Sequence, residues 1–217
     1  MTTSQLGIYN IALAALGERS LDSLSEDGEP LRELNQAWSR DKGLVRWALE
    51  QGHWKFALRS QQIDYDTSVS PGFGYSYSFE IPDDMVVLNM ISASERFQPP
   101  LLDYEEENGR WWADITPLYV RFVSDDDSYG GDMSLWPSSF SMWLGHALAL
   151  IIAPRYTTAA NISKLEQKTA RLFADAKGKD AVRGPVRFPP LGSWARSRGG
   201  YGSRYRERGR KDTLTGE

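Results

Sequence analysis

The carboxyl-terminal 35 residues, 183–217, constrain the fold of this 217-residue chain more than any other segment. They are rich in arginine, glycine and serine, and three prolines between positions 185 and 190 exclude a regular helix there. Nine basic and three acidic residues give the segment a charge of +6. Because the whole chain carries −4, residues 1–182 carry −10. A segment with so few apolar residues cannot form its own core, so we expect an acidic folded body (1–182) and an extended basic arm (183–217).

The composition of the body excludes several classes of protein. About 180 residues are enough for one domain with its own hydrophobic core. The chain has no cysteine, which excludes disulfides, thiolate metal sites and cysteine nucleophiles and is typical of proteins made in a reducing cytoplasm. The first 20 residues lack the early basic charge of a signal peptide, and no apolar run is long enough for a membrane span.

Hydrophobic residues at helical spacing predict four helices in the body. The expected ranges are about 4–16, 30–51, 138–153 and 160–180. Pro30 suits the first turn of the second helix, and Pro154 is expected to end the third. The fourth helix is amphipathic, with one polar face. The charged residues of this helix are Lys164, Glu166, Lys168, Arg171, Asp175 and Lys177.

The middle third of the chain, about 55–123, has the pattern of a β module. Strict alternation of apolar residues predicts a strand over 73–81. Further strands are expected at about 55–63, 85–91, 101–104, 110–113 and 117–123, and Asn108-Gly109 is a favourable hairpin turn. The expected fold class is therefore α+β: a small helical bundle of two helical hairpins, an inserted antiparallel β module and an extended C-terminal arm.

Candidate chemical groups in the sequence lack the partners that chemistry requires. His53 and His146 have no second ligand at metal-binding spacing, which favours structural roles. The run Asp125 to Gly130 resembles the start of a calcium loop, but Trp136 stands where a bidentate glutamate is needed, which favours a solvated loop. Glu105 to Glu107 is expected to be a solvated turn. We therefore predict a protein that is not an enzyme, with no catalytic residue, cofactor or metal.

The tryptophans divide between core and contact positions. Trp38, Trp47 and Trp143 follow the helical pattern of apolar residues and are expected in the core. Trp111 and Trp112 are adjacent on a predicted strand, so their side chains point to opposite faces. One of the two is therefore a candidate contact with another subunit or with a tail protein.

Six segments, taken in order, resemble one known family. These are ALAALGERSLDSLSED (12–27), GHWKFALRS (52–60), YSFEIPDDMVVL (77–88), SSFSMWLGHALALIIA (138–153), NISKLEQKTARLFADAKGKDA (161–181) and PPLGSWARSRG (189–199). Together they resemble the head-to-tail connector (adaptor) family of tailed bacteriophages, the group that contains tail tubular protein A. Each motif is weak by itself, and the order of the motifs over nearly the whole body carries the resemblance.

The resemblance implies a structural virion protein that forms a homo-oligomeric ring, usually of twelve copies. Such a ring lies under the portal protein, receives the distal tail component (nozzle, stopper or tail-completion protein) and lets genomic DNA pass without sequence recognition. The expected location is the neck or tail of the virion, after synthesis in the cytoplasm of the host bacterium. The β module would be the surface for the distal tail component.

The resemblance favours portal docking as the role of the arm, with arginines for carboxylates and aromatic residues as anchors. Contact with DNA and a plain solvated tail are the other interpretations. The alternatives for the whole protein are a nucleic-acid-binding protein that uses this arm and a tail-associated peptidoglycan hydrolase. The docking candidates are Arg187, Phe188, Pro189, Pro190, Leu191, Trp194, Arg196, Arg198, Tyr201, Arg204, Tyr205 and Arg206.

Overall fold

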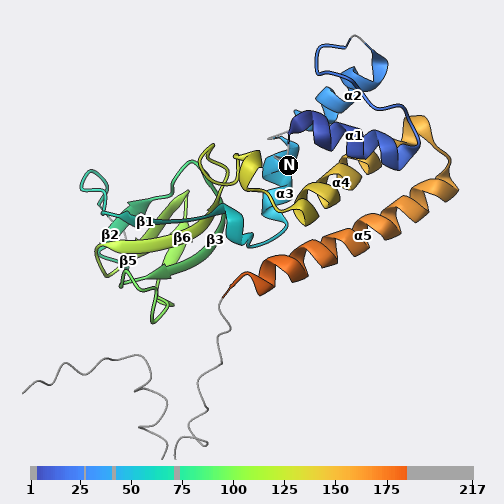
Figure 1. Cartoon of the computed structure of the whole chain (residues 1–217). Coiled ribbons are helices and arrows are strands. Elements are labelled where there is room, and N and C mark those ends of the chain that lie inside the picture. Colours follow the sequence, from blue (N-terminus) through green and yellow to red (C-terminus); the bar gives the residue numbers. More distant parts are fainter. Residues whose placement is uncertain (1–3, 27, 41–42, 71–73, 185–217) are drawn as a thin grey trace, which may run out of the picture. The chain divides into compact units, whose positions relative to one another are not determined.

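The computed structural model describes residues 4–26, 28–40, 43–70 and 74–184, and these residues form a mixed α+β fold (Figure 1). The predicted fold class is therefore confirmed. All twelve docking candidates of the arm, from Arg187 to Arg206, lie outside the described residues. The helices are α1 (Gln5–Leu16), α2 (Glu29–Trp38), α3 (Leu44–Glu50), α4 (Ser138–Tyr156) and α5 (Ala159–Val182). The strands are β1 (Leu58–Ile63), β2 (Tyr77–Glu80), β3 (Met85–Ser92), β4 (Glu105–Glu107), β5 (Arg110–Ala113) and β6 (Leu118–Ser124).

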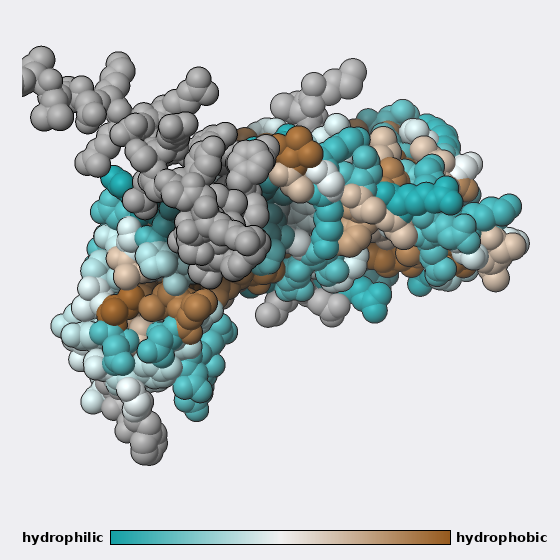
Figure 2. Space-filling model, turned by 90° about the horizontal axis from the view of Figure 1, so that it is seen from below, coloured by the Kyte–Doolittle hydropathy of each residue, from teal (hydrophilic) through white to brown (hydrophobic). Residues whose placement is uncertain are grey.

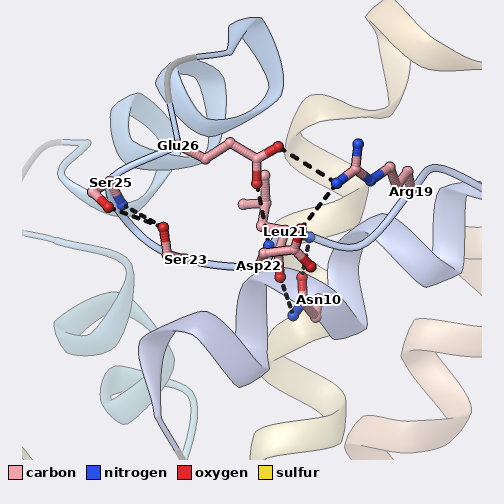
Figure 3. Close-up of polar contacts among 7 residues, drawn as sticks. All are labelled: Asn10, Arg19, Leu21, Asp22, Ser23, Ser25 and Glu26. Carbon is pink, nitrogen blue, oxygen red and sulfur yellow. Dashed lines mark hydrogen bonds and ion pairs between the residues drawn. The ribbon is translucent and has the colours of Figure 1, made fainter.

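Helix α1 begins and ends at the predicted signals. The Ser4 hydroxyl accepts a hydrogen bond from the Gly7 amide, and Gly17 ends the helix with a φ of 82°. The connector to α2 is held on α1 by Asn10 (Figure 3). The Asn10 side chain accepts a hydrogen bond from the Leu21 amide at 2.8 Å and donates one to the Leu21 carbonyl at 3.0 Å. These two bonds hold buried Leu21 against the helices.

The predicted helix over 30–51 is wrong as a single element, because two helices occupy this range. Helix α2 ends at Trp38, with Ser39 as its C-cap. Helix α3 begins only at Leu44, after Gly43 with φ 92° and ψ 143°. A positive φ is the left-handed region that favours glycine, and it cannot continue a right-handed helix. The sequence did not indicate this break, because apolar residues continue at helical spacing across both helices.

Helix α4 is the central helix of the bundle. It packs extensively against α1 and α5 and also contacts α2. Its predicted end at Pro154 is wrong, since α4 continues through Pro154 to Tyr156. The missing amide of Pro154 affects only the last turn, where the disruption of the helix is small. None of the helices among the described residues has the length and apolar character needed to cross a membrane.

Six strands form two three-stranded antiparallel sheets. Sheet A has the order β1–β6–β3, and sheet B has the order β2–β5–β4. Strands β4 and β5 form a hairpin whose turn residues, Asn108 and Gly109, both have positive φ, as a two-residue type I′ turn requires. A strand was predicted at 101–104, but these residues do not form one. A turn was predicted at Glu105–Glu107, but these residues form the short edge strand β4, because the hairpin aligns them with β5.

The two sheets share one hydrophobic core, and the helices have another. Phe79 and Trp111 of sheet B contact Val120 and Phe122 of sheet A in the core of the β module. Val123, the next residue on β6, instead belongs to the helical core. Because successive residues of a strand point to opposite faces, β6 contributes side chains to both cores.

Aromatic side chains fill the centre of the helical core. Trp54 lies 4.9 Å from Phe140 and 5.7 Å from Trp143, measured between ring centroids. Trp143 is buried as predicted, and Trp38 is half-buried. The prediction is wrong for Trp47, which is 44% exposed and stacks on Trp143 from outside. Helix α3 has only seven residues, and its buried face consists of Leu44, Ala48 and Leu49.

Candidate interaction surfaces

The two adjacent tryptophans of β5 point to opposite faces of sheet B, as the sequence predicts. Trp111 is fully buried in the core of the β module, where its Nε1 donates to the Glu106 carboxylate at 3.1 Å. Trp112 is half-buried on the other face, and its Nε1 is buried without a hydrogen-bond partner among the described residues. Of the two candidates for a subunit or tail contact, Trp112 is therefore the one whose side chain a partner can reach.

The outer face of sheet B combines Trp112 with exposed carboxylates. Glu105 lies opposite Trp112 in the register, and Glu107 lies opposite Arg110. Trp111 points into the core. Arg110 and Trp112 are its neighbours on β5, and Glu107 and Glu105 lie opposite them, so these four side chains point outward. The guanidinium of Arg110 is paired with Asp66 at 2.8 Å, whereas Glu105 and Glu107 pair with no basic residue of the described part of the chain. We call Glu105, Glu107 and Trp112 the acidic face of sheet B.

The helical bundle has an apolar groove beside Trp47. The groove, about 640 Å³, is lined by residues of α3, α4 and α5, including Trp47, Trp143, Leu150 and Ile151. Trp47 and Ile151 are both exposed. Figure 2 shows hydrophobic residues (brown) among hydrophilic ones (teal) over the β module and over the helices. Exposed aromatic and aliphatic side chains in a concave surface are typical of protein contact sites.

Helix α5 has an exposed basic stripe. Lys164, Lys168 and Arg171 follow each other at intervals of four and three residues, so they share one side of the helix. All three are exposed, and none forms an ion pair with a carboxylate of the described residues. Farther along the helix, Lys179 is already paired with Asp175 at 2.6 Å. The sequence pattern identified this polar face but did not indicate that these three cations lack acidic partners.

The negative charge of the body lies in the β module and in the loop that connects it to α4. Together these residues, 55–137, contain 15 acidic and 5 basic residues and carry −10, so the rest of 1–182 is neutral in sum. Two of the five cations are used internally, by the Arg59–Asp84 and Arg110–Asp66 pairs. The β module is therefore the strongly acidic part of the molecule, which the total charge of the chain does not reveal.

The helices and the β module are joined by a partly buried polar contact. The guanidinium of Arg46 on α3 pairs with Asp125 and donates to the Met85 carbonyl of β3 at 2.9 Å. Both charged side chains are about one-quarter exposed. Close packing supports this junction, because a Cβ at Gly130 would lie 2.2 Å from the Ser124 carbonyl and 2.7 Å from Leu49 Cδ1.

We predict that Arg46→Ala lowers the free energy of unfolding by about 1–2 kcal/mol, because it removes the donors of the Asp125 carboxylate and the Met85 carbonyl. Urea unfolding followed by circular dichroism measures the change. Arg19→Ala is the control, since the side chain of Arg19 is 77% exposed and its pair with Asp22 is solvated. Equal stability of the Arg46 variant and the wild type would mean that this pair does not stabilise the junction.

The two histidines lie in different environments. His53 is exposed, and His146 on α4 is buried, with its Nδ1 2.9 Å from the Met142 carbonyl. A carbonyl only accepts, so Nδ1 carries the proton. The Nε2 of His146 is buried and has no hydrogen-bond partner among the described residues. Burial lowers the pKa of His146, the bond to the Met142 carbonyl acts in the opposite direction, and nearby Lys168 lowers the pKa further.

This lowered pKa predicts that the protein loses stability as the pH falls below about 6.5, the value for histidine in an unfolded chain. In that range the unfolded chain binds a proton that the folded chain does not, so unfolding becomes more favourable. The free energy of unfolding, measured at pH 7.5 and 5.5, should fall less in His146→Leu than in the wild type. His53→Gln is the control and should behave as the wild type does. The pKa values of Asp66, Asp126 and Asp132 are also lowered, and they reduce the stability of the folded protein only at still lower pH, where aspartates of the unfolded chain bind protons.

Three further acidic groups, Asp125, Asp126 and Glu33, have local structural contacts. Asp126 accepts the Ser128 amide at 2.8 Å, and Asp125 pairs with Arg46. Glu33 on α2 is buried and pairs with Arg155. Burial and the neighbouring Glu33 carboxylate raise the pKa of Tyr156 to about 12. Among the described residues, no group of three or more potential ligands is placed to hold a metal ion.

No model of a known protein family matches this chain, and no curated protein matches it. The described residues offer three candidate contact surfaces: an aromatic groove, an acidic β module with a half-buried tryptophan, and a basic stripe on α5. Such surfaces bind other macromolecules through shape and charge.

Proposed function

We propose that this chain is a subunit of a head-to-tail adaptor ring in a tailed bacteriophage, where it links the portal protein to the distal tail component. The observation that carries the proposal is the order of the elements. Helices α1 to α3 precede a β module of two sheets, helices α4 and α5 follow it, and a basic segment comes after α5. This is the order of the family that the sequence resembles.

The charges of the chain fit such a role. DNA in the channel of a connector must slide, and a basic wall would hold its phosphates. A ring of about twelve subunits, each with −10 over residues 55–137, would repel the phosphates instead. The basic arm has the opposite charge and supplies arginines and the aromatic anchors Phe188 and Trp194 for docking on the portal.

The test is removal of the arm after Val182. The shortened chain should keep the circular dichroism spectrum and the unfolding midpoint of the full chain, because both hydrophobic cores lie within residues 8–176. It should fail to co-sediment with purified portal rings, whereas the full chain should co-sediment. Trp194→Ala in the full chain tests the aromatic anchor, with Thr215→Ala as a matched substitution in the same segment.

Two results would contradict the proposal at different levels. If the shortened chain binds portal rings as the full chain does, the arm is not the docking segment. If the full chain neither binds portal rings nor forms rings by electron microscopy, the adaptor function itself is wrong.

A second function, nucleic-acid binding, is favoured by one specific observation. Arginine and tyrosine alternate closely over Arg198, Tyr201, Arg204, Tyr205 and Arg206. Arginines contact phosphates and tyrosines stack on bases, so the pattern suits single-stranded nucleic acid. Salt-dependent binding of single-stranded DNA by the full chain, lost on removal of residues 183–217 and stronger than any binding to portal rings, would favour this function over the adaptor.

A further inference from the structure

Two oppositely charged surfaces of the body have matching spacings. Glu105 and Glu107 are alternate residues of edge strand β4 and are about 6.7 Å apart along it. Lys164 and Lys168 are separated by one turn of α5, a rise of about 6 Å. Two exposed carboxylates and two exposed ammonium groups can therefore face each other in register.

The residues beside these charges extend the match. Trp112 lies opposite Glu105 in the sheet B register, and Arg171 continues the basic stripe beyond Lys168. An arginine guanidinium packs favourably against the face of a tryptophan ring. The acidic face of sheet B thus offers two carboxylates and an indole, and α5 offers two ammonium groups and a guanidinium.

We propose that the basic stripe of α5 in one copy docks on the acidic face of sheet B in a second copy. Lys168 faces Glu105 and Lys164 faces Glu107, so that Arg171, which lies beyond Lys168 on the helix, packs on Trp112 beside Glu105. This proposal rests on the proposed function, because the contact described here is the one between neighbouring subunits of the adaptor ring. The two surfaces differ, so the contact is head-to-tail, and contacts of this type close into rings or continue as filaments.

The charge distribution favours this arrangement over a symmetric one. Two copies that met through their β modules would bring together two regions, residues 55–137 of each copy, with −10 each. Like charges at a contact oppose association, whereas opposite charges steer it and fix its register. Edge strand β4 also carries only glutamates, which disfavours its pairing with the edge strand of another copy.

A charge-swap experiment on the full chain tests the proposal. One variant reverses the stripe (Lys164→Glu, Lys168→Glu, Arg171→Glu), and the other reverses the face (Glu105→Lys, Glu107→Lys). Each variant alone presents two surfaces of the same sign, so sedimentation equilibrium should show self-association at least roughly tenfold weaker than in the wild type. An equimolar mixture of the two variants should associate again, because each reversed surface then meets its complement. High salt should weaken the association of the wild type.

Ala170→Glu/Ala174→Glu is the control, since it places acids elsewhere on the exposed surface of α5. The proposal requires that this variant associates like the wild type. It is overturned if the stripe and face variants associate as the wild type does, if their mixture stays as weak as each alone, or if the wild type remains monomeric at its highest soluble concentration. Portal binding is measured separately, so the adaptor function can survive each of these failures.

Discussion

Replacing Trp54 by alanine is expected to lower the free energy of unfolding by about 3–5 kcal/mol, the largest effect of any single substitution proposed for this protein. Trp54 is 1% exposed and lies between α3 and the first strand. Its ring contacts Phe140 and Trp143 of α4 and Phe173 of α5. Alanine would leave a cavity at the point where three helices and the entrance to the β module meet.

A hydrogen bond adds to the loss. The Nε1 of Trp54 donates to the Ala48 carbonyl at 3.0 Å, which leaves that buried carbonyl without this donor in the variant. Urea unfolding followed by circular dichroism at 222 nm avoids the changed tryptophan fluorescence. Trp47→Ala is the matched control and should cost only about 1 kcal/mol, because Trp47 is 44% exposed and lies at the edge of the core. Similar losses in the two variants would mean that Trp54 is not the centre of this core.

The second large effect is expected at the crossing of α1 and α4. A Cβ added at Gly145 would lie 2.5 Å from Ile11 Cγ2 and 2.8 Å from Ile11 Cβ. These distances are below van der Waals contact, and the Ile11 side chain is branched at that carbon and cannot swing away. Gly145→Ala should therefore destabilise the protein by about 1–3 kcal/mol, although alanine is the better helix former.

Gly178→Ala is expected to change the stability in the opposite direction in the same experiment. Gly178 is inside α5, and an added Cβ would have no heavy atom within 4 Å. The substitution should stabilise the protein by about 0.4–1 kcal/mol, because alanine restricts the unfolded chain. Thermal unfolding of both variants checks the pair. A Gly145→Ala protein as stable as Gly178→Ala would mean that α1 and α4 are not in such close contact.

Local signals predicted the elements that depend on neighbouring residues. Gly17 ends α1, and Asn108-Gly109 forms the turn of the β4–β5 hairpin, because both sites need positive φ. Alternation along β5 correctly placed Trp111 and Trp112 on opposite faces. The break between α2 and α3 was missed, since Gly43 interrupts a pattern of apolar spacing that otherwise continues.

Exposure was harder to predict than secondary structure. Trp47 and Trp143 both follow helical spacing, yet one is 44% exposed and the other 3%. The difference arises from residues far away in the chain, because Trp143 is covered by Trp54 and Phe173, whereas Trp47 covers only the outer side of Trp143. Periodicity identifies the apolar side of a helix but not how far a neighbouring element extends over it.

The amino-acid sequence alone determined the α+β class, the hairpin turn and the contrast between an acidic body and a basic final segment, because each depends on local conformation or on a count of charges. Tertiary structure alone decided which residues remain for partners. It left Lys164, Lys168 and Arg171 without acidic partners among the described residues, and it buried Trp111 while leaving Trp112 partly exposed. The physical reason is that burial and ion pairing join residues distant in the chain, and only the packed fold brings such residues together.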